Sequence, residues 1–75
     1  MTPTVDARGL SCPQPVLLAL KEMDRLQSGE IVVLVDTETS AENVSRAAAS
    51  RGWEVKSVTP EGDGTRLLIA RPQSP

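Results

Sequence analysis

The 75-residue chain contains no histidine, tyrosine or phenylalanine, and only one tryptophan and one cysteine, Cys12. Without histidine, the chain has no Cys–His or Ser–His pair to activate a nucleophile. One thiolate and no imidazole also leave too few good ligands for zinc, so we expect no metal. We expect no organic cofactor either. Any chemistry must therefore use the Cys12 thiol largely unaided, or take a base from a partner or from solvent.

A single cysteine excludes an internal disulfide, which favours a reducing, cytoplasmic location. The segment Met1 to Val5 is polar and contains no apolar signal region. The longest apolar run, Ile31 to Val35, is too short to cross a bilayer. The net charge of -2 comes with scattered lysine and arginine, so we expect no direct binding of nucleic acid. The length predicts one domain over residues 1–75, with a small aliphatic core.

Apolar periodicity predicts two strands and a helix in the first half of the chain. Thr4 to Arg8 alternates as a half-buried strand does, and Pro15 to Leu26 has helical spacing. Ser28-Gly29 supplies a glycine signal for the end of the helix. The β-branched run Ile31 to Val35 predicts a central strand.

The second half predicts another helix and a hairpin. Asp36 to Thr39 reads as a turn, and Thr39 with Glu42 has capping-box spacing for a helix that Gly52 ends. The predicted hairpin has strands at 53–58 and 65–71 and a turn at 60–64. The resulting β-α-β-α-β-β order predicts an α/β two-layer sandwich. Its mixed four-stranded sheet would have parallel crossovers between the first three strands, and both helices would lie on one face.

Cys12 falls between the first strand and the first helix, directly before Pro13. A helix N-terminus favours a thiolate by about 0.3–1 kcal/mol, which predicts a thiol pKa lowered by roughly one unit or less from ~8.5. Pro13 and Pro15 would stiffen the turn and keep the sulfur accessible. A lone cysteine can also be a small buried hydrophobe, and Ser11 with Gln14 has capping-box spacing of its own. Local physics alone leaves both interpretations open.

Four charged side chains lie near enough in sequence to influence this thiol. Asp6 and Glu22 would oppose thiolate formation if they lay close to the sulfur, whereas Arg8 and Lys21 would favour it.

The stretch Asp6 to Pro15 resembles the signature of the TusA/SirA/YedF family of small sulfur carriers, whose core is Gly-Leu-x-Cys-Pro-x-Pro after a first strand. The resemblance extends over nearly the whole chain, through Gly29-Glu30, Asp36 and Gly52. It implies a βαβαββ sandwich and a persulfide on Cys12. It also implies a cysteine desulfurase or rhodanese-type donor and a downstream acceptor protein, for example in tRNA thiolation, cofactor biosynthesis or sulfur metabolism.

The family motif further implies positioning roles around Cys12 for Gly9, Leu10, Pro13 and Pro15. The segment 42–44 looks more like the YedF branch, in which such a domain precedes a second one and is linked with selenium metabolism. Two other functions are kept as alternatives. One is a non-catalytic interaction or regulatory module, and the other is a one-cysteine redox sensor.

The remaining distinctive side chains are interpreted structurally. We expect Trp53 and Met23 to lie in the core, although Trp53 could instead anchor a partner. Arg46 and Arg51 are expected on a solvated helix face, with docking of an acidic partner as the alternative.

Overall fold

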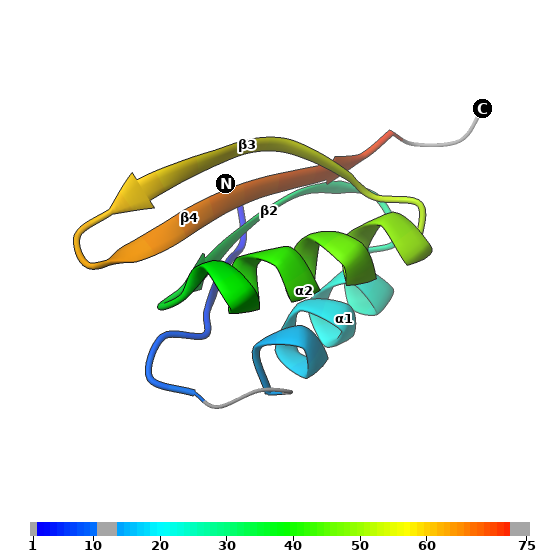
Figure 1. Cartoon of the computed structure of the whole chain (residues 1–75). Coiled ribbons are helices and arrows are strands. Elements are labelled where there is room, and N and C mark those ends of the chain that lie inside the picture. Colours follow the sequence, from blue (N-terminus) through cyan, green and yellow to red (C-terminus); the bar gives the residue numbers. More distant parts are fainter. Residues whose placement is uncertain (1, 11–13, 73–75) are drawn as a thin grey trace.

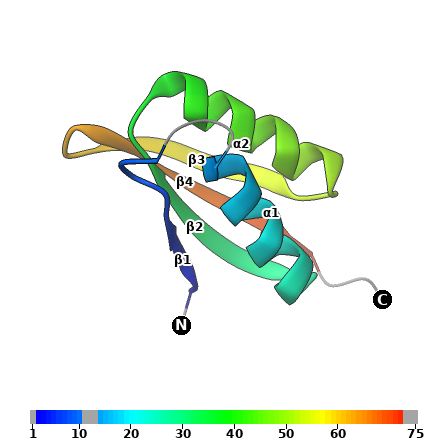
Figure 2. The same cartoon turned by 90° about the horizontal axis from the view of Figure 1, so that it is seen from below.

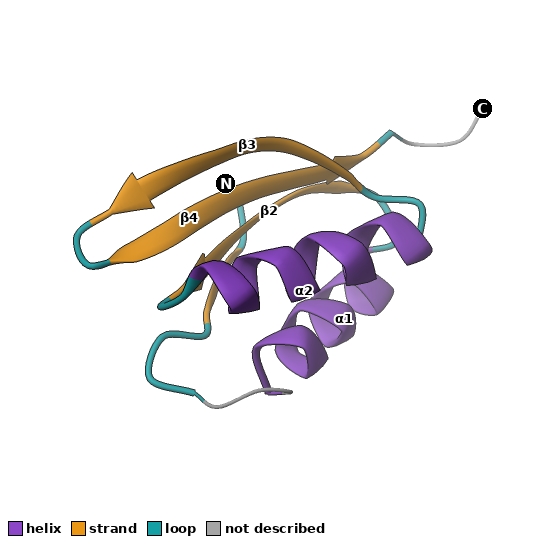
Figure 3. Ribbon diagram, viewed as in Figure 1, coloured by secondary structure: helices purple, strands orange, loops and turns teal. Residues whose placement is uncertain are grey.

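Six elements follow one another in the order β-α-β-α-β-β over residues 2–10 and 14–72, which are the residues that the computed structural model describes (Figures 1 and 3). They are β1 (Thr4–Asp6), α1 (Gln14–Leu26), β2 (Gly29–Val35), α2 (Glu38–Ser50), β3 (Glu54–Glu61) and β4 (Gly64–Arg71). The four strands form one mixed sheet, and both helices cover the same face of it (Figure 2). The predicted two-layer α/β sandwich is confirmed.

The strands lie in the order β1-β2-β4-β3 across the sheet. β1 pairs parallel with β2, as the helical crossover predicts, and β4 pairs antiparallel with both β2 and β3. β3 therefore runs in the same direction as β2 without pairing with it, because β4 lies between them. This order leaves β3 as a long edge strand, whereas the opposite edge is formed by the three residues of β1.

The end of α1 differs from the predicted glycine stop. The helix ends at Leu26, and Gln27 takes the left-handed conformation with φ 65°. The Gln27 amide donates to the Met23 carbonyl at 2.8 Å, which satisfies one of the last helical carbonyls. Gly29 instead begins β2. The left-handed position of this helix end is thus filled by a residue other than glycine, at the cost of a backbone conformation that glycine adopts more easily.

The start of α2 corrects the predicted cap at Thr39. Thr37 is the N-cap, with extended backbone angles (φ -128°, ψ 157°), and its side-chain oxygen accepts from the Ser40 amide at 3.1 Å. Thr39 lies inside the first turn. The cap falls at Thr37 because β2 ends at Val35, which leaves only two residues between strand and helix. The predicted stop at Gly52 is confirmed, with φ 79° directly after the C-cap.

The hairpin between β3 and β4 is tighter than the predicted turn over residues 60–64. Glu61 pairs with Gly64, so only Gly62 and Asp63 form the loop. Pro60 lies within β3 instead of the turn. A proline is tolerated there because β3 is an edge strand, where a missing N–H costs no ladder hydrogen bond.

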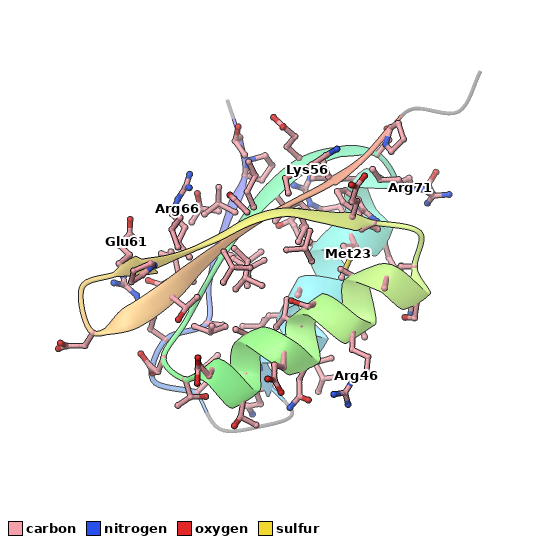
Figure 4. All side chains as sticks on the ribbon, turned by 45° about the horizontal axis from the view of Figure 1, so that its top comes forward. Met23, Arg46, Lys56, Glu61, Arg66 and Arg71 are labelled. Carbon is pink, nitrogen blue, oxygen red and sulfur yellow. The ribbon has the colours of Figure 1, made fainter. Side chains whose placement is uncertain are left out.

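The core lies between the sheet and the two helices. Met23 and Trp53 are both buried, as predicted, and Figure 4 shows Met23 between the helices and the strands. The other core residues are small or aliphatic: Val5, Ala7, Ala19, Ile31, Val33, Val35, Ala41, Val44, Ala48, Leu67 and Ile69. The alanines on α1 and α2 allow the helices to pack closely on the sheet.

Candidate functional site

The candidate site lies in the connection from β1 to α1. Two of its predicted residues, Cys12 and Pro13, lie outside the described residues. Gly9 and Leu10 on one side, and Pro15 on the other, are described and form the frame of this connection.

Gly9 turns the chain away from the sheet. Its φ is +78°, a left-handed conformation that residues with a side chain adopt at a cost of about 1–2 kcal/mol. A Cβ at this position would meet nothing within 4 Å, so the conformation, and not crowding, favours glycine. The Gly9 amide donates a hydrogen bond to the Asp36 carboxylate. Because Asp36 directly follows β2, this bond ties the β1–α1 connection to the end of the parallel β1–β2 pair.

Pro15 anchors the other flank. It is the second residue of α1 and one of the fully buried side chains of the core. The first turn of a helix does not need its N–H groups for intrahelical bonds, so proline fits here without loss. Burial of this ring places the first turn of α1 in the protein interior. The positions of Gly9 and Pro15 therefore hold both ends of the segment that contains Cys12.

The flanks also expose apolar side chains. Leu10 is 37% exposed, and on the first turns of α1 Leu17 and Leu18 are 56% and 37% exposed. The sequence analysis did not single out Leu17 and Leu18, although a signal was present. Both fall outside the helical stripe of core positions, and leucine away from that stripe predicts an apolar surface.

The charged residues near the site largely neutralise one another. Arg8 binds Asp6 in a two-pronged ion pair, with Nε donating to Oδ1 at 2.9 Å and Nη2 donating to Oδ2 at 2.8 Å. The side-chain hydrogen bonds from Arg8 lower the pKa of Asp6 to about 2, and the same contact raises the pKa of Arg8 above its usual value. Glu22 pairs with Arg25. Asp6 and Glu22 are thus engaged by arginines, which reduces their opposition to a nearby thiolate.

The start of α1 has the polarity that favours an anion. Its first turn carries no acidic residue, so no side chain of that turn cancels the partial positive charge of the helix N-terminus. Among residues 2–10 and 14–72, no three histidine, cysteine, aspartate or glutamate side chains gather as a metal site. Neither α1 nor α2 is long and apolar enough to cross a membrane.

Arg46 of α2 and Arg51, the C-cap residue of that helix, have different surroundings. Arg51 forms an ion pair with Asp24 of α1, so it links the two helices. Arg46 is exposed and borders a groove between α2 and β3.

The family model described as sulfurtransferase TusA matches residues 3–71. YrkI of Bacillus subtilis is 38% identical, over 89% of this chain and 91% of its own. The sulfur carrier protein TusA of Allochromatium vinosum is 31% identical, over 89% of this chain and 90% of its own. The crystal structure of a SirA-like protein from Desulfitobacterium hafniense superposes with a TM-score of 0.86 at 28% identity, covering 96% of this chain and all of that one.

Proposed function

Because the chain belongs to the sulfurtransferase TusA family, we propose that Cys12 accepts sulfane sulfur as a persulfide and relays it to an acceptor protein. The observation that carries the proposal is that the only cysteine of the chain lies between Gly9 and Pro15, two residues whose positions the fold fixes. A role in sulfur transfer in general follows from the family. The persulfide, its donor and its acceptor are parts of the proposal.

The reaction needs no net oxidation. The Cys12 thiolate attacks the terminal sulfur of a donor persulfide, R–S–SH. The donor S–S bond breaks, and the donor leaves as a thiolate that takes up a proton. The products are Cys12–S–SH and R–SH. An acceptor thiolate then attacks the terminal sulfur of Cys12–S–SH and regenerates the Cys12 thiol, so the protein is a stoichiometric relay whose turnover depends on its partners.

The surroundings of Cys12 suit this exchange. The chain has no histidine to remove the thiol proton, so the thiolate fraction depends on the local potential. The N-terminus of α1 contributes about 0.3–1 kcal/mol toward the thiolate, and its first turn has no carboxylate to oppose it. A modestly lowered pKa is adequate for thiol exchange, because very acidic thiols are weak nucleophiles.

The proposed donors are a cysteine desulfurase or a rhodanese-type protein, in the cytoplasm, where a single cysteine stays reduced. The proposed acceptors are proteins of tRNA thiolation, cofactor biosynthesis or sulfur metabolism. No direct contact with nucleic acid is part of the proposal, because the net charge is -2.

The test is the intact mass of the protein after incubation with a cysteine desulfurase and cysteine, and separately with a rhodanese and thiosulfate. We expect wild type to gain one sulfur atom that a reductant removes, and Cys12→Ser to gain none while remaining folded. Gain of sulfur by Cys12→Ser would refute the assignment. Absence of sulfur on the wild-type protein with both donors would refute the proposed relay from these donor classes.

A further inference from the structure

A groove of about 770 Å³ lies between α2 and the β3–β4 hairpin. Its walls are Glu38, Ala41, Glu42, Ser45 and Arg46 of α2, Val58 and Pro60 of β3, and Thr65 of β4. Thr65 pairs with Val35 at the end of β2, directly before the Asp36 that holds Gly9. The groove therefore opens at the same end of the sheet as the connection that contains Cys12.

The floor of the groove is apolar and uncovered. Val58 lies opposite Leu67 in the register of β3 and β4, so both side chains are on the helix-covered face. Leu67 is fully buried, whereas Val58 is 53% exposed. The facing residues of α2 are the small Ala41 and Ser45, which do not reach across to cover it. An aliphatic side chain from another molecule would complete this packing.

The groove also borders a free sheet edge. β3 is an edge strand, and Pro60, which has no N–H, is accommodated there because its nitrogen faces outward. Strand backbone repeats every two residues, so the N–H and C=O of Val58 face outward as well. Beyond it, the register shift between Val55 and Ser57 interrupts the edge. A bulge and a proline limit the stretch of this edge that is available for pairing to a short segment around Val58.

The charges along the groove indicate the chemistry of its occupant. Glu38, Glu42 and Arg46 are spaced four residues apart, so they form one row along α2. None of the three joins an ion pair within the described part of the chain. Figure 4 shows Arg46 projecting outward from α2. Two unpaired carboxylates near the hairpin end would attract a cationic side chain.

We propose that this groove docks an extended segment of a partner protein, which adds as a short strand to the outer edge of β3. The segment places an aliphatic side chain against Val58 and Ala41, and a lysine or arginine beside Glu38 and Glu42. An edge strand flanked by a helix is a recurrent setting for strand addition, in which backbone bonds give affinity and side-chain contacts give specificity. Identification of that partner as the sulfur donor or acceptor rests on the proposed function, but docking itself does not.

The test is an NMR titration of the full-length ¹⁵N-labelled protein with the peptide acetyl-Lys-Val-Thr-Val-Lys-amide. A second peptide, with glutamate in place of both lysines, reports the charge preference. We expect saturable shifts of the amides of Val58, Ala41 and Ser45 with the lysine peptide, and weaker binding of the glutamate peptide. Glu42→Lys should weaken the lysine peptide roughly tenfold. Glu30→Lys, the same charge change in β2 away from the groove, is the matched control and should leave the affinity unchanged.

Several results would overturn the docking proposal. They are no saturable shift with the lysine peptide, shifts that map to the uncovered face of the sheet, equal affinity for both peptides, or equal weakening by Glu30→Lys and Glu42→Lys. Broadening of β3 amides that grows with protein concentration, without peptide, would assign the groove to a second copy of this chain.

The docking proposal and the sulfur-relay proposal can fail separately. Because docking does not need Cys12, we expect Cys12→Ser to bind the lysine peptide with the wild-type affinity. If the wild-type protein binds the peptide but accepts no sulfur, the docking proposal is supported and the sulfur relay is refuted. If the wild-type protein accepts sulfur but does not bind the peptide, the sulfur relay is supported and the docking proposal is refuted.

Discussion

Gly9→Ala tests whether the β1–α1 connection positions Cys12. Gly9 has φ +78°, and an added Cβ meets no atom within 4 Å. The cost is therefore the left-handed backbone alone, about 1–2 kcal/mol. A domain of this size has a free energy of unfolding of roughly 4–11 kcal/mol, so the variant should remain folded. Its melting temperature should fall by about 4–8 °C for each kcal/mol lost.

The chain offers a closely matched control. Gly52 has φ +79° just beyond the C-terminal end of α2, and a Cβ there would meet only the Arg71 side chain, in ordinary contact at 3.6 Å. Gly52→Ala should therefore reduce the free energy of unfolding by a similar amount. Urea denaturation of both variants measures that loss.

The two variants should differ in sulfur transfer. In Gly9→Ala the backbone at position 9 is strained, and we expect its relaxation to weaken the hydrogen bond to Asp36 and to shift the β1–α1 connection. We expect the rate of persulfide formation to fall on the order of tenfold for Gly9→Ala, since small displacements of reacting groups are costly. Gly52→Ala should react at the wild-type rate. Equal rates for both variants, or equal slowing, would refute the positioning role of Gly9.

Three further predictions concern stability. The pKa of Asp6 is lowered to about 2 because Arg8 binds its ionised form. The ion pair therefore stabilises the folded state above the ordinary pKa of aspartate, near 4, and this stabilisation is lost as the pH falls from 4 toward 2. In acid denaturation, Asp6→Asn should lack the loss of stability in this pH range. Met23→Ala should lower the free energy of unfolding by about 2–5 kcal/mol in urea, because the side chain is fully buried, and a loss below 1 kcal/mol would contradict its place in the core. Gly64→Ala should lower the free energy of unfolding by at least the ~1–3 kcal/mol of an overpacked site, because the added Cβ would collide with the Val35 carbonyl oxygen. A melting temperature equal to that of wild type would disprove that contact.

Local pattern was sufficient to predict the elements and their order. The helical stripe that ends at Leu26 and the β-branched run Ile31 to Val35 lie in the predicted types of element. The boundaries moved where a competing feature decided them. The N-cap of α2 is Thr37 and not Thr39, because only two residues, Asp36 and Thr37, lie between the end of β2 and the start of the helix. Pro60 lies in β3 and not in the turn, because an edge strand tolerates proline. Sequence did not predict that β4 lies between β2 and β3, since a hairpin can dock on either side of its own first strand.

The candidate site was predictable in part. The structure shows that Gly9 is left-handed and Pro15 is buried, two features that the motif did not specify. The role of Cys12 and the positioning roles of Gly9, Leu10, Pro13 and Pro15 remain predictions. The partner of Gly9 was not predictable, because Asp36 is 27 residues away and meets it only through the pairing of β1 with β2. The groove beside Val58 was missed for the same reason, since its walls come from three elements.

The strand order has a consequence for the newly made chain. β4 comes last along the sequence, yet it lies between β2 and β3. While residues 64–71 are still inside the ribosome exit tunnel, β2 has only the three-residue β1 beside it, and β3 has no partner strand. Pairing over such long sequence separation is intrinsically slow, because the entropy of closing the loop is lost before the contacts form. The hydrogen bond from Gly9 to Asp36 therefore joins a strand pair whose inner side is completed only when β4 docks on β2.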